Sequence, residues 1–116
     1  MEIVNKPWGF ETHWAKTDKY VGKILTIKKG QSLSLQHHEI KEETIMVLSG
    51  QMALRVGKTV QEALTSSPHI LNPKEVFHIP PKLIHRMIAL EDTEVLEVST
   101  PELDDVVRHQ DNYGRS

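Results

Sequence analysis

Four polar side chains in the sequence have the types and the spacing of a metal site. Gln36 and His38 are two residues apart in a strand-like stretch, so both side chains project from the same side of it. Glu43 returns from the next strand, and His85 follows a proline turn much later in the chain. Amide, imidazole and carboxylate ligands suit zinc, manganese, nickel or iron. The sequence therefore predicts one divalent metal ion at Gln36, His38, Glu43 and His85, and leaves its identity open.

One neighbouring histidine is an alternative ligand. His37 lies between Gln36 and His38, and strand alternation aims its side chain to the opposite side. His37 replaces one of the two only if the chain twists at this point.

The composition limits the possible functions. The absence of cysteine excludes a disulfide framework, a thiolate nucleophile and a sulfur-ligated metal. The formal net charge of −2 lacks the positive excess of proteins that bind a phosphate backbone, so nucleic acid is not an expected partner. No apolar run reaches the roughly 20 residues of a membrane span, and no signal-peptide core follows Met1. We expect one cytoplasmic domain over residues 1–116, with no membrane partner.

Short strands at regular spacing must position the ligands, which indicates an all-β sandwich or barrel. We expect residues 65–74 to be irregular, and the polar tail 101–116 to end exposed, with a short helical turn at 102–107. The last two strands are expected to form a hairpin about residues 91–93. Strands are predicted over residues 8–14, 20–28, 33–38, 45–48, 51–56, 59–64, 75–79, 84–90 and 94–99.

Alternation within two strands predicts which side chains share a face. Val21, Lys23, Leu25 and Ile27 fall on one face of the second strand. Lys23 is then either a strand-end lysine whose amine reaches water or a lysine of a pocket. In the next strand, Leu33 and Leu35 are expected to face away from Ser34, Gln36 and His38.

The wider spacing of these residues resembles the two motifs of the cupin family. Cupins normally have histidine where Gln36 stands, and Gln at that place is similar to the type II phosphomannose isomerase branch. The first motif is matched by Gly30-x5-Gln36-x-His38-x4-Glu43-x6-Gly50 and the second by Pro80-x4-His85. Further matches to that branch are Lys6-Pro7-Trp8-Gly9, Lys23, residues 104–108 and residues 111–115.

The resemblance implies a small double-stranded β-helix, which is a jelly-roll-like barrel, and homodimers are common in the family. It also implies a metal-dependent isomerase that interconverts the aldose and ketose forms of a sugar phosphate such as mannose 6-phosphate. Lys23, Glu42 and His78 are then candidates for moving the proton, with His37 and a metal-bound water as further options. Lys23, Lys41 and Arg86 are candidates for holding the phosphate.

Two departures from the family pattern bear on function. Lys82 replaces the usual glycine in the second motif, where a positive φ is costly, so we expect that loop to be rearranged. The sequence from Lys41 to Ile45 lacks the family's arginine and tryptophan around the glutamate. That loss favours an alternative, a non-catalytic module that binds a sugar or a nucleotide sugar. A metal-dependent oxygenase is disfavoured because Gln36 is a weak donor for redox iron.

The basic residues of the tail have two possible roles. Arg108 and Arg115 could clasp the tail against the barrel or contact a phosphate group. The sequence leaves this choice open.

Overall fold

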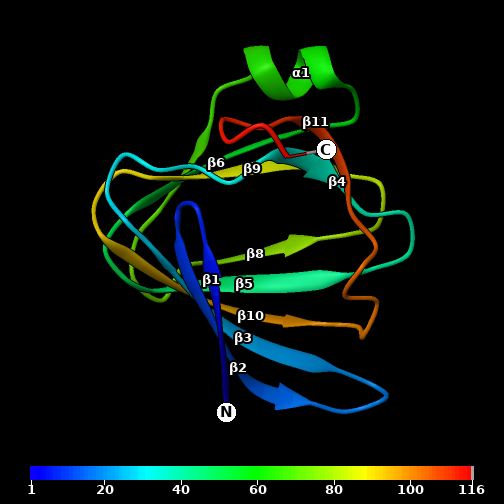
Figure 1. Cartoon of the computed structure of the whole chain (residues 1–116). Coiled ribbons are helices and arrows are strands. Elements are labelled where there is room, and N and C mark those ends of the chain that lie inside the picture. Colours follow the sequence, from blue (N-terminus) through cyan, green and yellow to red (C-terminus); the bar gives the residue numbers. More distant parts are fainter. Residues whose placement is uncertain (116) are drawn as a thin grey trace.

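In the computed structural model, which describes residues 1–115, two antiparallel sheets pack face to face and a short helix lies outside them (Figure 1). The first sheet has the strand order β1-β2-β3-β10-β5-β8. Its strands are β1 (Glu2–Lys6), β2 (Gly9–Lys16), β3 (Val21–Ile27), β10 (Thr93–Ser99), β5 (Glu43–Ser49) and β8 (Val76–Ile79). This architecture confirms the predicted all-β double-stranded β-helix.

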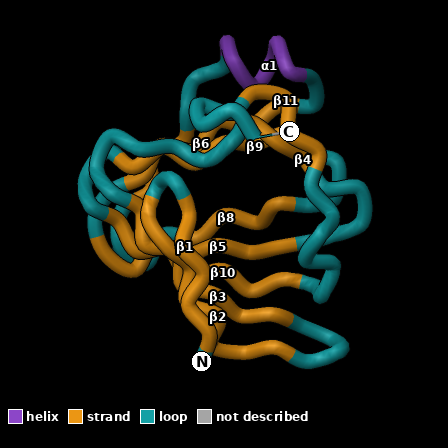
Figure 2. Tube along the Cα trace, in the orientation of Figure 1, coloured by secondary structure: helices purple, strands orange, loops and turns teal. Residues whose placement is uncertain are grey.

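The second sheet has the order β11-β4-β9-β6-β7, and the helix α1 (Val60–Thr65) lies beyond its outer face (Figure 2). Its strands are β11 (Val107–Gln110), β4 (Leu35–His37), β9 (Ile84–Ala89), β6 (Met52–Gly57) and β7 (His69–Leu71). Within residues 1–115, no helix has the length and apolar character needed to cross a bilayer.

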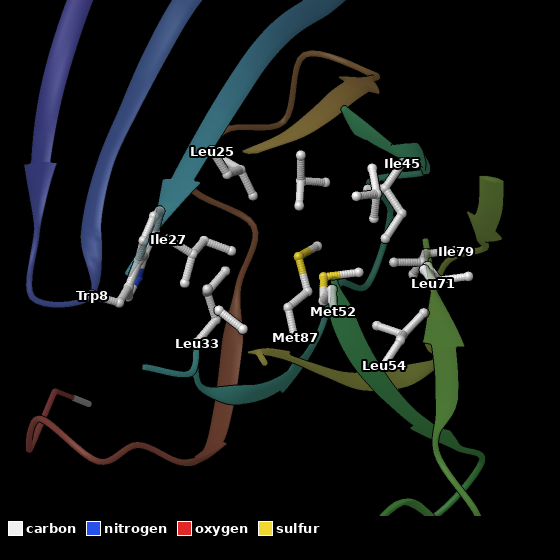
Figure 3. Packing of buried hydrophobic residues seen from close by; sticks show 13 residues of the cluster. Trp8, Leu25, Ile27, Leu33, Ile45, Met52, Leu54, Leu71, Ile79 and Met87 are labelled. Atoms are coloured by element: carbon white, nitrogen blue, oxygen red, sulfur yellow. The ribbon is translucent and has the colours of Figure 1, made fainter. Parts of the chain in front are cut away.

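The hydrophobic core fills the space between the two sheets (Figure 3). Trp8, Leu25 and Ile45 come from the first sheet and its first hairpin, and Met52 and Met87 come from the second. Fully burying each such side chain contributes about 1.5–3 kcal/mol. This packing fixes the relative position of the sheets, and therefore of the polar residues that share their inner faces.

Strand β3 shows the predicted alternation. Val21, Lys23, Leu25 and Ile27 are all buried on its inner face. On the outer face the ring of Trp14 covers Gly22, where an added Cβ would lie 2.6 Å from the ring. Lys23 is therefore a lysine of the interior and not one at an exposed strand end.

Residues 59–64, predicted as a strand, form the N-cap and most of α1 instead. The Thr59 hydroxyl accepts a hydrogen bond from the backbone N–H of Glu62, which is the pairing of a helix N-cap. Ala63 packs with Leu35 and Ile84 on the outer face of the second sheet. The Thr-x-x-Glu spacing in the sequence is a helix-start signal that outweighs the strand-like pattern of Val60 and Leu64.

The predicted hairpin around residues 91–93 is also wrong, although both of its strands exist. β9 pairs with β4 and β6 in the second sheet, whereas β10 pairs with β3 and β5 in the first. The turn therefore crosses from one sheet to the other. Apolar side chains on the inner faces of both strands make this crossing favourable, because Met87 and Val95 are then buried between the sheets.

The tail is more ordered than predicted. Turns at residues 101–106 replace the expected helical turn, and β11 then pairs with β4. Beyond β11, Asn112 donates to the Ser32 hydroxyl and Tyr113 donates to the side chain of Gln31. The irregular stretch 65–74 similarly contains the short strand β7.

The predicted shared face of Leu33 and Leu35 is not observed. Leu33 packs into the main core, while Leu35 packs under α1 on the opposite side of the sheet. β4 begins only at Leu35, so the strand alternation assumed across residues 33–35 does not apply.

Candidate metal centre

Three buried side chains from separate parts of the chain converge between the sheets. His38 follows β4, Glu43 begins β5, and His85 lies on β9. Oε1 of Glu43 is 3.5 Å from Nε2 of His38 and 3.3 Å from Nε2 of His85. The three ligand atoms lie within 4.8 Å of one another, and the residues are 4%, 3% and 1% exposed. We call these residues the ligand triad.

Backbone carbonyl groups orient both imidazole rings. Nδ1 of His38 donates to the carbonyl oxygen of Asp105 across 2.5 Å, and Nδ1 of His85 donates to that of Leu83 across 2.9 Å. Because a carbonyl oxygen only accepts, Nδ1 of each ring carries a proton, so Nε2 of the neutral ring is the nitrogen that can bind a metal. This arrangement is common behind metal-binding histidines.

The surroundings of the two imidazole Nε2 atoms show whether a metal ion fits between these residues. Nε2 of His38 and Nε2 of His85 are buried and make no hydrogen bond with any of the residues 1–115. An unpaired buried polar atom costs about 1–3 kcal/mol, which a bound cation would remove. Two imidazole nitrogens and one carboxylate are also a usual donor set for zinc, manganese, nickel or iron. The triad therefore fits a divalent cation.

Gln36 lies next to the triad on the neighbouring strand, and its backbone is in register with His85. Its side chain lines a cavity beside the triad, and its Oε1 accepts a hydrogen bond of 2.8 Å from the Ser34 hydroxyl. Its role as a fourth ligand stays a prediction. His37, the alternative ligand, instead contacts His109 and Glu39 with its two ring nitrogens, at 2.8 Å and 2.7 Å.

A cavity of about 100 Å³ opens beside the triad, and its lining is unusually rich in charge. Nζ of Lys41 lies 3.5 Å from Glu43 and 3.3 Å from Glu97, and Nζ of Lys23 lies 3.3 Å from Glu11. We refer to this space as the metal cavity. It is lined by Lys6, Glu11, Lys23, Leu25, Leu33, Gln36, His38, Lys41, Glu43, Met87, Glu97, Leu103, Val106 and Arg108.

Burial and neighbouring groups shift the pKa values of Glu97 and Glu43 in opposite directions. Burial and the neighbouring Glu43 raise the pKa of Glu97 to about 7. Burial also opposes ionisation of Glu43, but His38, His85 and Lys41 outweigh it and hold the pKa of Glu43 well below its usual range. Burial similarly opposes the charge on Lys41, yet Glu97 and Glu43 raise its pKa. Glu43 is therefore ionised, and Lys41 stays a cation beside it.

Two residues expected in catalysis lie outside the cavity. His78 and Glu42 pair with each other across 2.5 Å, and their side chains are 52% and 51% exposed. Glu43 faces inward at the start of β5, so the preceding Glu42 faces outward, and His78 is in register with Thr44 on that same strand. The structure does not bring these residues to the triad.

Arg86, expected to hold a phosphate, is also directed away from the cavity. Its Nε donates to the carbonyl oxygen of Leu33 across 2.9 Å, and its Nη2 lies 3.4 Å from the carbonyl oxygen of Gln110. Arg86 follows His85 on β9, so alternation sends its side chain to the opposite face. It holds the tail against the barrel. Of the residues predicted for substrate contact, Lys23 and Lys41 do line the cavity.

Sequence reasoning missed Glu97 and Glu11, which both line the metal cavity. Glu97 lies on the inner face of β10, as the burial of Val95, Glu97 and Ser99 shows, and Glu11 is a buried residue of β2. The period of two in β10 was the available signal, because it places Glu97 on the same face as Val95.

The loop before His85 keeps the conformation that glycine favours. Lys82 has a φ of 71°, and the N–H of Leu83 bonds to the carbonyl oxygen of Pro80. This is the pattern of a type II turn with proline at its second position. The predicted rearrangement is therefore wrong, because Lys82 accepts the positive φ and donates its N–H to the carbonyl oxygen of His38.

Known structures share this fold. KdgF from Halomonas sp. superimposes with a TM-score of 0.75 at 19% identity, covering 90% of this chain and 91% of that one. An RmlC-like cupin from Shewanella frigidimarina gives a TM-score of 0.74 at 14% identity, covering 89% and 86%.

Sequence relatives are longer proteins. The mannose-1-phosphate guanylyltransferase ManC of Salmonella typhimurium is 32% identical over 97% of this chain. The alginate biosynthesis protein AlgA of Pseudomonas aeruginosa is 31% identical over 97% of this chain. This chain spans 23% of the length of each of these two relatives. The family described as mannose-6-phosphate isomerase C-terminal matches residues 1–111, and the chain belongs to that family.

Proposed function

We propose that this chain is a metal-dependent isomerase that interconverts the aldose and ketose forms of a sugar phosphate, with mannose 6-phosphate as the substrate to test first. The observation that carries the proposal is the pair of imidazole Nε2 atoms that, with Glu43, face one another at a cavity lined by lysine and carboxylate side chains. The family description points to the same activity.

The residues of the cavity have separate roles in this proposal. His38, Glu43 and His85 would hold the cation, with Gln36 as a fourth ligand. A bound divalent cation supplies Lewis-acid polarisation of the oxygens on C1 and C2. Lys41 keeps Glu43 ionised and adds positive charge where oxygen becomes negative.

A base must move the proton between C1 and C2, and we assign that role to Glu97. It lines the metal cavity, is not one of the ligands, and its Oε2 lies 3.3 Å from Nζ of Lys41. Lys23 stays a second candidate because it lines the same cavity, but its amine is engaged with Glu11.

Turnover by the metal-loaded protein tests the proposal. The chain is loaded in turn with zinc, manganese or nickel, mixed with mannose 6-phosphate, and assayed for fructose 6-phosphate. We expect turnover with at least one metal and its loss in Glu43→Gln, which removes the anionic ligand. Absence of turnover by protein that binds one equivalent of each metal would overturn the proposal. Binding of the sugar phosphate without turnover would instead favour the non-catalytic sugar-binding module.

A further inference from the structure

A second, smaller recess of about 60 Å³ adjoins the metal cavity. The two spaces share five lining residues and therefore lie against each other: Lys6, Glu11, Leu33, Gln36 and Arg108. We call this space the outer recess. A single water needs roughly 10–15 Å³ of such volume, so the outer recess is large enough for a small polar group. Its lining is completed by Trp8, Ser34 and Arg115.

Three cationic side chains reach the outer recess from the two ends of the chain. Lys6 ends β1, Arg108 lies on β11, and Arg115 follows in the tail. The backbone of Arg108 is in register with Gln36 of β4, and side chains of directly opposed residues share one face of a sheet. The recess therefore lies where the first hairpin and the tail meet over the barrel.

The charge of this region differs in sign from that of the protein. The whole chain has a formal net charge of −2. Glu11 is the acidic residue of the outer recess, and its Oε1 is already engaged by Lys23 at 3.3 Å and by His13 at 2.9 Å. Asp111 holds Arg115 by two hydrogen bonds of 3.0 Å and 2.9 Å, which fixes the position of that guanidinium. The recess therefore has an excess of positive charge, and one of its guanidinium groups is held in place.

We propose that the outer recess binds the phosphate group of the substrate through Lys6 and Arg108, with Arg115 held beside them by Asp111. Guanidinium groups match the oxygens of a phosphate as a planar fork, and lysine adds a point charge. The sugar would then extend from the outer recess into the metal cavity, with C1 and C2 toward the triad. The inference rests on the proposed isomerase function.

Binding of inorganic phosphate, mannose 6-phosphate and mannose to the metal-loaded chain tests this assignment by calorimetry. We expect Lys6→Met and Arg108→Met each to weaken binding of mannose 6-phosphate about ten-fold or more, and to leave metal affinity unchanged. Lys16→Met is the matched control, since this exposed lysine lies at the other end of the first hairpin. The control should stay within about two-fold of the unmodified chain, because screening weakens distant charges.

The outcomes separate this inference from the proposed function. If phosphate binding depends on Lys6 and Arg108 but no turnover occurs, the phosphate site in the outer recess is supported and the isomerase proposal is rejected. If the chain turns over substrate and Lys6→Met leaves KM unchanged, the isomerase proposal stands and phosphate binding in the outer recess is overturned. An equal loss of affinity in Lys16→Met would also overturn phosphate binding in the recess. A melting curve for each variant shows that it folds, and Lys6→Met alone decides the matter if Arg108→Met does not fold.

Discussion

Asp105 accepts a hydrogen bond from Nδ1 of His38 through its backbone carbonyl, although 67 positions separate the two residues. The carboxylate of the same residue accepts the backbone N–H groups of Glu39, Ile40 and Lys41. Those three hydrogen bonds lower the pKa of Asp105 to about 2. One residue of the tail thus fixes both a ligand ring and the loop that joins His38 to Glu43.

Replacing Asp105 with alanine should weaken metal binding. The variant keeps the carbonyl group but leaves three N–H groups without their acceptor, so the loop that carries His38 and Glu43 becomes less ordered. Residues that orient metal ligands typically contribute about 10–100-fold in affinity, and we expect a loss in that range. Calorimetric titration with zinc measures it.

Asp104 provides the control for this experiment. It is the exposed neighbour of Asp105, and Asp104→Ala removes the same charge without touching the loop. Equal zinc affinity in Asp105→Ala and the unmodified chain would show that the tail does not support the ligands.

Replacing Lys82 with glycine should stabilise the protein. Lys82 has a φ of 71°, a region that costs a residue with a Cβ about 1 kcal/mol or more and costs glycine little. We expect an increase of about 1 kcal/mol in the free energy of unfolding, or a rise of about 4 °C in Tm. Lys82→Ala removes the same charge and keeps the Cβ, so it should show no such gain. Similar gains in both variants would assign the effect to charge.

Replacing Glu97 with glutamine should reduce catalysis without removing the metal. If Glu97 moves the proton, kcat should fall about 10²-fold or more, while zinc stoichiometry stays at that of the unmodified chain. Glu94→Gln is the matched control, since Glu94 is an exposed carboxylate on the same strand. An unchanged kcat in Glu97→Gln would transfer the role to another residue of the cavity, with Lys23 next to be tested.

The pairing of Asp111 with Arg115 should make stability depend on pH in acid. The Arg115 side chain lowers the pKa of Asp111 to about 2, below its usual value of 3.8. A lowered carboxyl pKa stabilises the folded state above the ordinary pKa, and this contribution is lost as pH falls toward the folded-state value. The unmodified chain should therefore lose its advantage over Asp111→Asn between about pH 4 and about pH 2. Denaturant unfolding of both proteins across that range measures the difference, and a constant difference would contradict the pairing.

Side-chain spacing was sufficient to predict much of the site. The types and spacing of His38, Glu43 and His85 predict that these side chains meet, and the structure brings them together. The inner face of β3 follows from a period of two, but the choice between a strand-end and a pocket position for Lys23 required the structure.

The missed features depend on contacts between distant segments. The sequence of the turn after β9 is compatible with a hairpin and with a crossing between the sheets. The packing of Met87 and Val95 in one core favours the crossing. The inward position of Glu97 was visible in the alternation of β10, but its meaning required the cavity. The Thr59 cap, by contrast, is a local feature, because the Thr59-x-x-Glu62 spacing is present in the sequence itself.

One of the two tryptophans is buried beside the outer recess and the other is exposed, so tryptophan fluorescence can report on the recess. Trp8 is 2% exposed and lines the outer recess, whereas Trp14 is 47% exposed on the opposite side of the first sheet. A Trp14→Phe protein would have Trp8 as its single indole. Its intrinsic fluorescence would then follow occupancy of the recess directly, in solution and without a label.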